Sequence, residues 1–281
     1  MPAGLHKKIN WKNPILFCAT LLALFLCFRM QDGAYGNLDC MTVMGADTGI
    51  WEAEESSKTQ KDKVNDASLA EAPEPKIAYL TFDDGPSENT RTILEILNKY
   101  DVKATFFLIG EEITPEREEL LKEMVEQGHS IGIHTYCHEK EKIYASAENY
   151  WDDFNKAYEK IMQVTGVGPE ILRFPWGSVN KYMSGIGDKV IKDLNEKGFT
   201  YYDWNVSGED AVGKPTKSSI MKNIKHDLTK YNEPVILLHD GSSNQLTAEA
   251  LPDIIEYIKA NGYDFDVVQH RYKPYQYRRN Q

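Results

Sequence analysis

The stretch YLTFDDGP, residues 79–86, joins an apolar run of strand-forming residues to a short polar turn. The run ends in two adjacent aspartates, Asp83 and Asp84, and Gly-Pro follows. A turn with Gly-Pro is common after a strand, and one aspartate is enough to stabilise it. Two neighbouring carboxylates repel each other. The second aspartate therefore needs a reason other than turn formation.

Outward from this stretch, short apolar runs alternate with helical patterns. Seven strands are expected, at residues 76–82, 104–110, 130–135, 171–175, 199–204, 234–239 and 263–268. Six helices are expected between them. The first two span residues 88–100 and 114–128, the third ends near Gly166 and the fourth near Gly198. The fifth begins at Thr216, and the sixth ends near Gly262. Such alternation implies a parallel sheet, either a barrel related to the (β/α)8 fold or an open doubly wound sheet. Both place functional residues at the carboxyl ends of strands.

The N-terminal region has a different pattern. Basic residues within 6–12 precede the apolar run ILFCATLLALFLCF, residues 15–28, which is typical of an export signal. The run is shorter than the ~20 residues of a full membrane span, but no convincing cleavage site follows it, so we favour a retained anchor with its basic side inside. We expect an anchor or signal at 1–30, an extracytoplasmic linker at 31–75 and the folded domain at 76–281.

The composition limits the classes of function. Of the 281 residues, 27% are charged and 41% hydrophobic, which suffices for a packed core in one or two domains. The net charge of -11 argues against a nucleic-acid partner, because phosphate contacts need clustered Lys and Arg. Two of the four cysteines lie in the apolar run, so no disulfide framework is expected, and Cys137 is expected to be a free thiol.

Titratable side chains follow most of the expected strands. They are Asp83 and Asp84, His134 and His138, Arg173, Glu209 and Asp210, and His239 and Asp240. The carboxyl ends of parallel strands share one rim, so these groups should gather there. His134 and His138 are spaced i and i+4 and would face the same way on a helical turn. Two imidazoles and one carboxylate form the protein part of a catalytic zinc site that leaves a position for water.

Each of these motifs also has a purely structural interpretation. A His-x3-His pair alone is more often structural than metal-binding, and Asp-Gly-Pro is an ordinary turn. Together the two motifs favour chemistry, because a turn accounts for one aspartate more easily than for two. If one aspartate binds a metal, the other is free to act as a base on the metal's water, whose pKa falls to ~7.

Five motifs, TFDDG, HTYCH, RFPWG, WNVSGEDA and ILLHD, occur in this order. In order and spacing they resemble the motifs of the NodB-type polysaccharide deacetylases, carbohydrate esterase family four. Within that family, the chain most resembles the bacterial peptidoglycan N-acetylglucosamine deacetylases. The resemblance extends from residue 76 to near residue 270. It implies an α/β fold, a distorted (β/α)7 barrel of the polysaccharide deacetylase type, in agreement with the strand count.

The resemblance implies roles for the matching residues. Asp83 corresponds to the general base, and Arg173 to the arginine that keeps it ionised and aimed. The metal ligands would be Asp84, His134 and His138. The metal of the family is usually Zn²⁺, with Co²⁺ or Fe²⁺ as alternatives for such a donor set.

The other half of the implied machinery lies later in the chain. His239 corresponds to the general acid that protonates the leaving amine, and Asp210 to the carboxylate that keeps it protonated. The backbone N–H of Trp176 corresponds to a donor to the oxyanion. Leu237 would line the pocket for the acetyl methyl group.

Two positions depart from the family pattern. Ala211 stands where many members have tryptophan, so one wall of the acetyl pocket is missing or comes from elsewhere. Trp176 stands where many have tyrosine, which matters less if its backbone N–H does the work. Outside the motifs, His129, His226 and His270 are expected at the surface. The C-terminal tyrosines Tyr272, Tyr275 and Tyr277 are expected in a solvated tail, with sugar stacking as the alternative. Asp240 is expected either to orient His239 or to stabilise a turn.

The resemblance thus implies a metal-dependent hydrolase that removes N-acetyl groups from N-acetylglucosamine-type sugars of a cell-envelope polysaccharide. Peptidoglycan is the first candidate for this polysaccharide. The alternatives are an O-deacetylase of acetylated xylan or a similar polymer, and an inactive anchored carbohydrate-binding protein, which Ala211 motivates. We expect a monomeric catalytic domain, bound to the membrane through the N-terminal segment or secreted if that segment is cleaved. The sequence leaves open the physiological polymer and the native metal.

Overall fold

The computed structural model describes residues 75–277. The expected anchor, and the expected linker except for its last residue, lie outside the described residues. Within 75–277, none of the helices combines the length and the apolar character that a membrane span requires.

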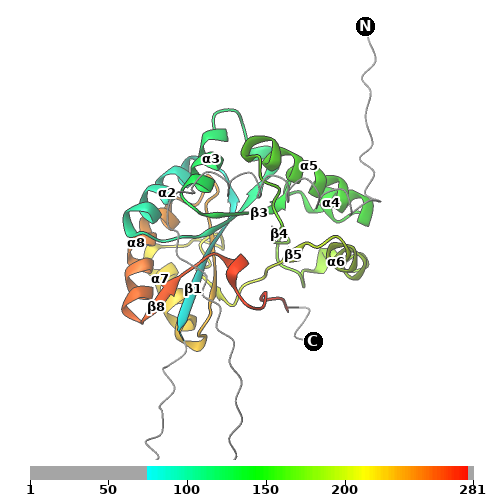
Figure 1. Ribbon diagram of the computed structural model, residues 1–281. Coiled ribbons are helices and arrows are strands. Elements are labelled where there is room, and N and C mark those ends of the chain that lie inside the picture. The colour runs from blue at the N-terminus through cyan, green and yellow to red at the C-terminus, as the bar shows by residue number, and fades with distance from the viewer. Residues whose placement is uncertain (1–74, 278–281) are drawn as a thin grey trace, which may run out of the picture. The chain divides into compact units, whose positions relative to one another are not determined.

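A parallel sheet forms the centre of the fold (Figure 1). Its strands are β1 (Lys76–Gly85), β2 (Thr105–Ile109), β3 (Ser130–Thr135), β4 (Ile171–Leu172), β5 (Thr200–Tyr201), β6 (Val206–Ser207), β7 (Val235–His239) and β8 (Tyr263–Phe265). Seven of them follow the order β5-β4-β3-β2-β1-β7-β6, and β8 pairs with β1 beside this path. All the pairs are parallel. The expected distorted (β/α)7 barrel is confirmed, although β5 and β6 end the path without pairing to each other.

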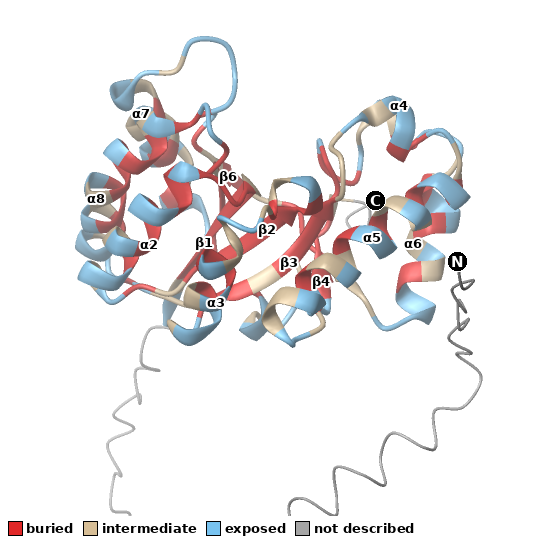
Figure 2. Cartoon of the chain, turned by 90° about the horizontal axis from the view of Figure 1, so that it is seen from above, coloured by how far each residue is buried: buried red, intermediate tan, exposed pale blue. Residues whose placement is uncertain are grey.

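Helices flank this sheet. They are α2 (Glu88–Tyr100), α3 (Glu118–Glu126), α4 (Lys140–Ile143), α5 (Ala147–Thr165), α6 (Gly187–Glu196), α7 (Lys217–Asp227) and α8 (Gln245–Ala260). Short 3-10 helices are η1 (Gly110–Glu112), η2 (Lys181–Met183), η3 (Leu228–Lys230) and η4 (Val268–His270). Figure 2 shows buried strands between a group formed by α2, α7 and α8 and another formed by α4, α5 and α6. Exposed residues lie on the outer faces of both groups, as amphipathic helices require.

The expected helices form, with corrections at their ends. The helix expected from Thr114 begins at Glu118 instead, because the N–H groups of Arg117 and Glu118 both donate to the Thr114 carbonyl and close a turn there. Met183 and Leu228 lie in the short 3-10 helices η2 and η3, which precede α6 and follow α7. The start of α7 is confirmed by Thr216, whose side chain accepts from Ser219 N in a capping box. Neither α4 nor β6 was expected, because each is too short to show a period.

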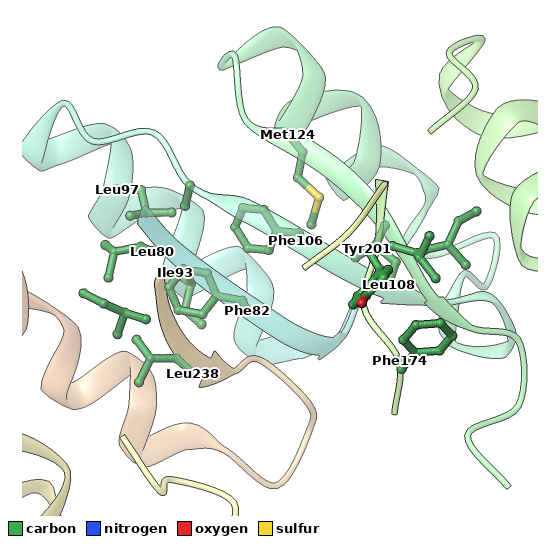
Figure 3. Packing of buried hydrophobic residues seen from close by; sticks show 14 of the residues in the cluster. Leu80, Phe82, Ile93, Leu97, Phe106, Leu108, Met124, Phe174, Tyr201 and Leu238 are labelled. Atoms are coloured by element: carbon green, nitrogen blue, oxygen red, sulfur yellow. The ribbon is translucent and has the colours of Figure 1, made fainter. Parts of the chain in front are cut away.

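The core fixes the strand on which the two aspartates lie. Residues 78–82 of β1 are all buried, as in strands covered on both faces. Phe82 stacks on Phe106 of β2 with ring centroids 5.2 Å apart, and both lie among the leucines and isoleucines of Figure 3. Burying one such side chain stabilises the fold by roughly 1.5–3 kcal/mol. The end of β1 is therefore a rigid base for Asp83 and Asp84.

Candidate active site

The two aspartates at the end of β1 are separated by a break in the strand. Asp83 keeps the strand register and lies opposite Phe107 of β2 and His239 of β7. The register with β2 shifts between Asp83 and Gly85, and Asp84 between them has a φ of 74°. A left-handed φ is uncommon outside glycine, although aspartate tolerates it better than most residues. The bulge, more than the alternation of an ideal strand, turns the two carboxylates apart.

Asp84 lies beside both histidines of the HTYCH motif. Its Oδ1 is 3.4 Å from His134 Nε2 and 3.5 Å from His138 Nε2. One ligand atom from each of the three residues lies within 4.8 Å of the others. Within residues 75–277, Asp84 Oδ1 is buried without a hydrogen-bond partner. A buried, unpaired carboxylate oxygen facing two imidazole nitrogens fits a divalent metal with room for water.

The orientation of His134 is set by a second contact. Its Nδ1–H donates to the carbonyl of Arg173 at 2.9 Å, which leaves Nε2 unprotonated and directed at Asp84. Burial, followed by the neighbouring His138, holds the pKa of His134 well below its usual value. A neutral imidazole with its second nitrogen anchored is the form in which histidine binds metals.

The turn that presents His138 is not the expected helical turn. Residues 136 and 137 form a bend after β3, and His138, which follows it, has a φ of 53°. Asp153 on α5 holds this bend, because its carboxylate accepts from Thr135 Oγ1 at 2.5 Å, Tyr136 N at 2.7 Å and Cys137 N at 3.1 Å. The sequence showed Asp153 only as one acid on a helix. Cys137 is a free thiol, as expected.

Asp83 is paired with a fully buried arginine. Arg173 Nη1 donates to Asp83 Oδ1 at 2.9 Å and to Thr81 Oγ1 at 2.7 Å, while its Nε donates to the Tyr202 carbonyl at 3.0 Å. Burial raises the pKa of Asp83 to about 6, although the charge of Arg173 acts in the opposite direction. Asp83 is therefore ionised at neutral pH, yet more basic than an exposed carboxylate, as suits a proton acceptor.

His239, level with Asp83 on the neighbouring strand, is paired with a buried carboxylate. Its Nδ1 donates to Asp210 Oδ1 at 2.9 Å, and its backbone N donates to Oδ2 at 2.7 Å. Thr247 Oγ1 also donates to Oδ2, at 2.6 Å. Burial alone would lower the pKa of His239. The hydrogen bond and charge of Asp210, and to a smaller extent the charge of Asp83, raise that pKa to about 9. His239 is thus a protonated donor at neutral pH.

The loop carrying Trp176 is held in a left-handed turn. Trp176 has a φ of 63° and Gly177 a φ of 79°. Buried Asp203 fixes the next residue by accepting from Ser178 N at 2.8 Å and Ser178 Oγ at 2.6 Å. The same carboxylate accepts from Tyr277 N at 2.8 Å. The expectation of a solvated tail is therefore wrong for Tyr277, because this hydrogen bond ties the tail to the Trp176 loop.

The remaining residues of the site lie close to these groups. Leu237 is a buried residue of β7, next to Thr81 of β1, and Ala211 is exposed. The Trp204 ring lies 5.7 Å from the Arg173 guanidinium carbon. Trp204 therefore packs against the arginine. The roles assigned to Leu237 and to the other site residues stay predictions.

Two further expectations, for His129 and for Asp240, need correction or a decision. His129 is buried and not at the surface, because its Nδ1 accepts from Ala104 N at 3.1 Å, and burial lowers its pKa to about 4. His226 and His270 are exposed, as expected. Asp240 lies beneath the DDG turn: its Oδ2 accepts from Thr90 Oγ1 at 2.6 Å, and a Cβ on Gly85 would lie 2.3 Å from Oδ2. The turn interpretation therefore fits Asp240 better.

Comparison with known proteins gives one family. Residues 70–202 match the family described as polysaccharide deacetylase. A peptidoglycan-N-acetylglucosamine deacetylase of Bacillus cereus is 33% identical over 219 residues, which cover 76% of this chain and 77% of that protein. The catalytic domain of a peptidoglycan N-acetylglucosamine deacetylase from Eubacterium rectale is 35% identical with a TM-score of 0.69, covering 75% of this chain and 96% of that domain.

A relative with a different name is also similar to this chain. A bifunctional xylanase/deacetylase of Pseudobutyrivibrio xylanivorans is 34% identical over 194 residues, which cover 69% of this chain but only 30% of that protein.

Proposed function

The chain belongs to the polysaccharide deacetylase family, and from this premise we propose that it removes N-acetyl groups from N-acetylglucosamine-type sugars in peptidoglycan. The observation that carries the proposal is the placement of a carboxylate, Asp83, level with a protonated imidazole, His239, beside a set of metal ligands. A sugar-binding protein needs neither a base nor an acid, which argues against the inactive alternative. Relatives named peptidoglycan-N-acetylglucosamine deacetylases support the choice of polymer.

Members of this family depend on a metal, and we propose zinc for this chain. Asp84, His134 and His138 would hold it. When bound, it would supply Lewis-acid activation of water and of the acetyl carbonyl. The same donors also suit Fe²⁺ or Co²⁺, so metal analysis of the full chain purified without chelators under anaerobic conditions decides between them.

The base side of the reaction belongs to Asp83. Arg173 holds Oδ1 of this carboxylate, which leaves Oδ2 to accept a proton from the attacking water. The fixed charge of Arg173 keeps Asp83 ionised and aimed before attack. A carboxylate with a pKa of about 6 holds the proton more firmly than an exposed carboxylate and can pass it on within the site.

The acid side belongs to His239. Its Nδ1–H is bound by Asp210, so Nε2–H is the proton available to the nitrogen of the leaving sugar. Protonation of that nitrogen is required because an amine anion is a poor leaving group. The Trp176 N–H, in its left-handed turn, would donate to the oxyanion formed by attack on the acetyl carbonyl.

O-deacetylation of an acetylated xylan is the second candidate. The resemblance to a bifunctional xylanase/deacetylase favours it, and the same acid, base and ligands would serve an ester. An ester needs less help from an acid, because an alkoxide leaves more readily than an amine anion. The strong pairing of His239 with Asp210 therefore favours the amide substrate.

The location is a further part of the proposal. The apolar run at 15–28 after basic residues supports an N-terminal anchor at 1–30, a linker at 31–75 and a monomeric catalytic domain at 76–281 outside the cytoplasm. Membrane fractionation of the full chain, and of a variant lacking residues 1–30, tests the anchor. Light scattering of the purified chain tests the monomer.

Acetate release decides the activity. The full chain, loaded with Zn²⁺, is incubated with purified peptidoglycan, N-acetylglucosamine oligomers and acetylated xylan, and the products are analysed by mass spectrometry. The proposal expects products lighter by one acetyl group from peptidoglycan and from the oligomers. Folded, metal-loaded protein that releases acetate only from xylan would replace the first candidate by the second.

A further inference from the structure

An aromatic and basic strip, formed by Trp176, Tyr182, Lys140 and Lys181, lies next to the metal-ligand cluster. The centroid of the Trp176 ring is 4.7 Å from that of His138 and 5.4 Å from that of Tyr182. Trp176 thus links the two rings, yet it is 43% exposed. A large apolar ring that is open to solvent beside a reaction site is suited to contact a ligand.

Two lysines from different segments meet at the ring of Tyr182. Lys140 Nζ, in the first turn of α4, lies 5.1 Å from the ring centroid. Lys181 Nζ, in η2, lies 5.3 Å from the same centroid. Cations at this distance are attracted by the face of an aromatic ring. Both ammonium groups are therefore held at the Tyr182 ring, which contacts Trp176.

The charge of this strip is positive, although the chain as a whole carries a net charge of -11. Lys140 is paired with Glu141 at 3.5 Å, and neighbouring Glu139 with Lys142 at 2.6 Å. Lys181 contacts the ring of Tyr182 but has no ion-pair partner within the described part of the chain. The local acids are thus balanced, and the charge of Lys181 is left for an anion.

We propose that the strip is a subsite for a sugar that bears a carboxylate, next to the sugar that loses its acetyl group. The apolar face of the glycan would stack on Trp176, and the carboxylate would bind Lys181, with the partly neutralised Lys140 nearby at the same tyrosine ring. The chain would then prefer an anionic N-acetylated glycan to a neutral one. The preference rests on the proposed function, because a subsite directs a reaction only if the neighbouring site is active.

A matched pair of substrates tests the subsite in the full, metal-loaded chain. One oligosaccharide alternates N-acetylglucosamine with a sugar that carries an ether-linked lactyl carboxylate, and in the other each carboxylate is converted to a primary amide. Exposed charge pairs are each weak, so the double variant Lys140→Ala/Lys181→Ala should lower kcat/KM for the carboxylate substrate by about 3- to 10-fold. The loss should come from KM, shrink with added salt and be absent with the amide.

Lys225→Ala is the matched control, because Lys225 Nζ lies 5.0 Å from the ring of Tyr257 between α7 and α8. It removes a lysine from a tyrosine ring outside the strip, and both substrates should react as with the parent chain. Equal kcat/KM for the two substrates in the parent, or equal losses on both in the double variant, would overturn the subsite and leave the deacetylase intact. Acetate from neither substrate would overturn the proposed function as well.

Discussion

Two buried ion pairs in the site have the same length but opposite orientation. Arg173 Nη1 lies 2.9 Å from Asp83 Oδ1, and His239 Nδ1 lies 2.9 Å from Asp210 Oδ1. In the first pair the cation is fully buried and the carboxylate side chain is 5% exposed. In the second pair the carboxylate is fully buried and the imidazole is 17% exposed. In the first pair the group nearer to solvent is a proton acceptor, Asp83, and in the second pair it is a proton donor, His239.

The reversal separates the roles of base and acid. A guanidinium does not give up its proton, so Arg173 favours the ionised form of Asp83 even though burial raises the pKa of Asp83 to about 6. Asp210 favours the protonated form of His239, whose pKa lies at about 9 despite burial. Because β1 and β7 pair with Asp83 opposite His239, the proposed base and the proposed acid would face the same substrate.

Removing the carboxylate of the first pair should have the largest effect. In Asp83→Asn the amide cannot accept the proton, so kcat/KM for acetate release should fall by ~10²–10⁴. Bound metal should persist, because Asp83 is not in the ligand set. The matched variant Asp84→Asn should lose metal, as measured by mass spectrometry of bound metal. Equal metal loss in the two variants would contradict the division of labour between these aspartates.

Removing the buried carboxylate of the second pair, Asp210, should lower the pKa of His239 and reduce kcat/KM by less than Asp83→Asn does. In Asp210→Asn the pKa of His239 should fall from about 9 towards its ordinary value of ~6.5, which reduces the protonated fraction at pH ~8 by ~30-fold. The alkaline limb of kcat/KM should move to lower pH. Thr247→Val removes only one hydrogen bond to Asp210 and is the milder control. A lower kcat with an unmoved limb would show that Asp210 does not set this pKa.

A variant outside both pairs tests whether the metal ligands are positioned independently of them. Asp153→Asn disturbs the bend before His138, and loss of such a support costs about 10- to 100-fold in metal affinity. Competition with a coloured chelator measures that affinity. Exposed Asp152→Asn, one residue earlier on α5, is the control and should bind metal as the parent does. Equal metal affinities in the parent chain and both variants would show that Asp153 does not position a metal ligand.

The unmutated chain gives the mildest test of the comparison. The proposed roles require ionised Asp83 and protonated His239, so kcat/KM should rise as pH increases through about 6 and fall as pH increases through about 9. Outside this window it should change by about tenfold per pH unit. A profile of kcat/KM from pH 4 to 11, with circular dichroism to verify folding, measures both limbs. A plateau that extends well below pH 6 would remove Asp83 as the titrating base.

Local patterns were sufficient for the strands other than β6 and for the residues at their ends. Apolar runs bounded by polar turns are short-range features, so β1, β3 and β7 were predicted with Asp83, His134 and His239 at their ends. Supports that act across the fold had no such signal. Asp153 contacts the HTYCH bend from α5, and Asp203 binds Tyr277, which is 74 positions away. No periodicity links such residues, which also explains the errors for His129 and the C-terminal tail.

The sequence by itself determined the parallel α/β fold and the candidate chemistry, because hydrophobic period and residue type are properties of neighbouring positions. Only the tertiary structure decided which member of each pair faces the site. Arg173 reaches Asp83 across 90 positions of chain, and the bulge at Asp84 turns the second carboxylate towards the histidines. Burial and charge at a given atom depend on everything packed around it, so the difference between base and acid arises only when the chain folds.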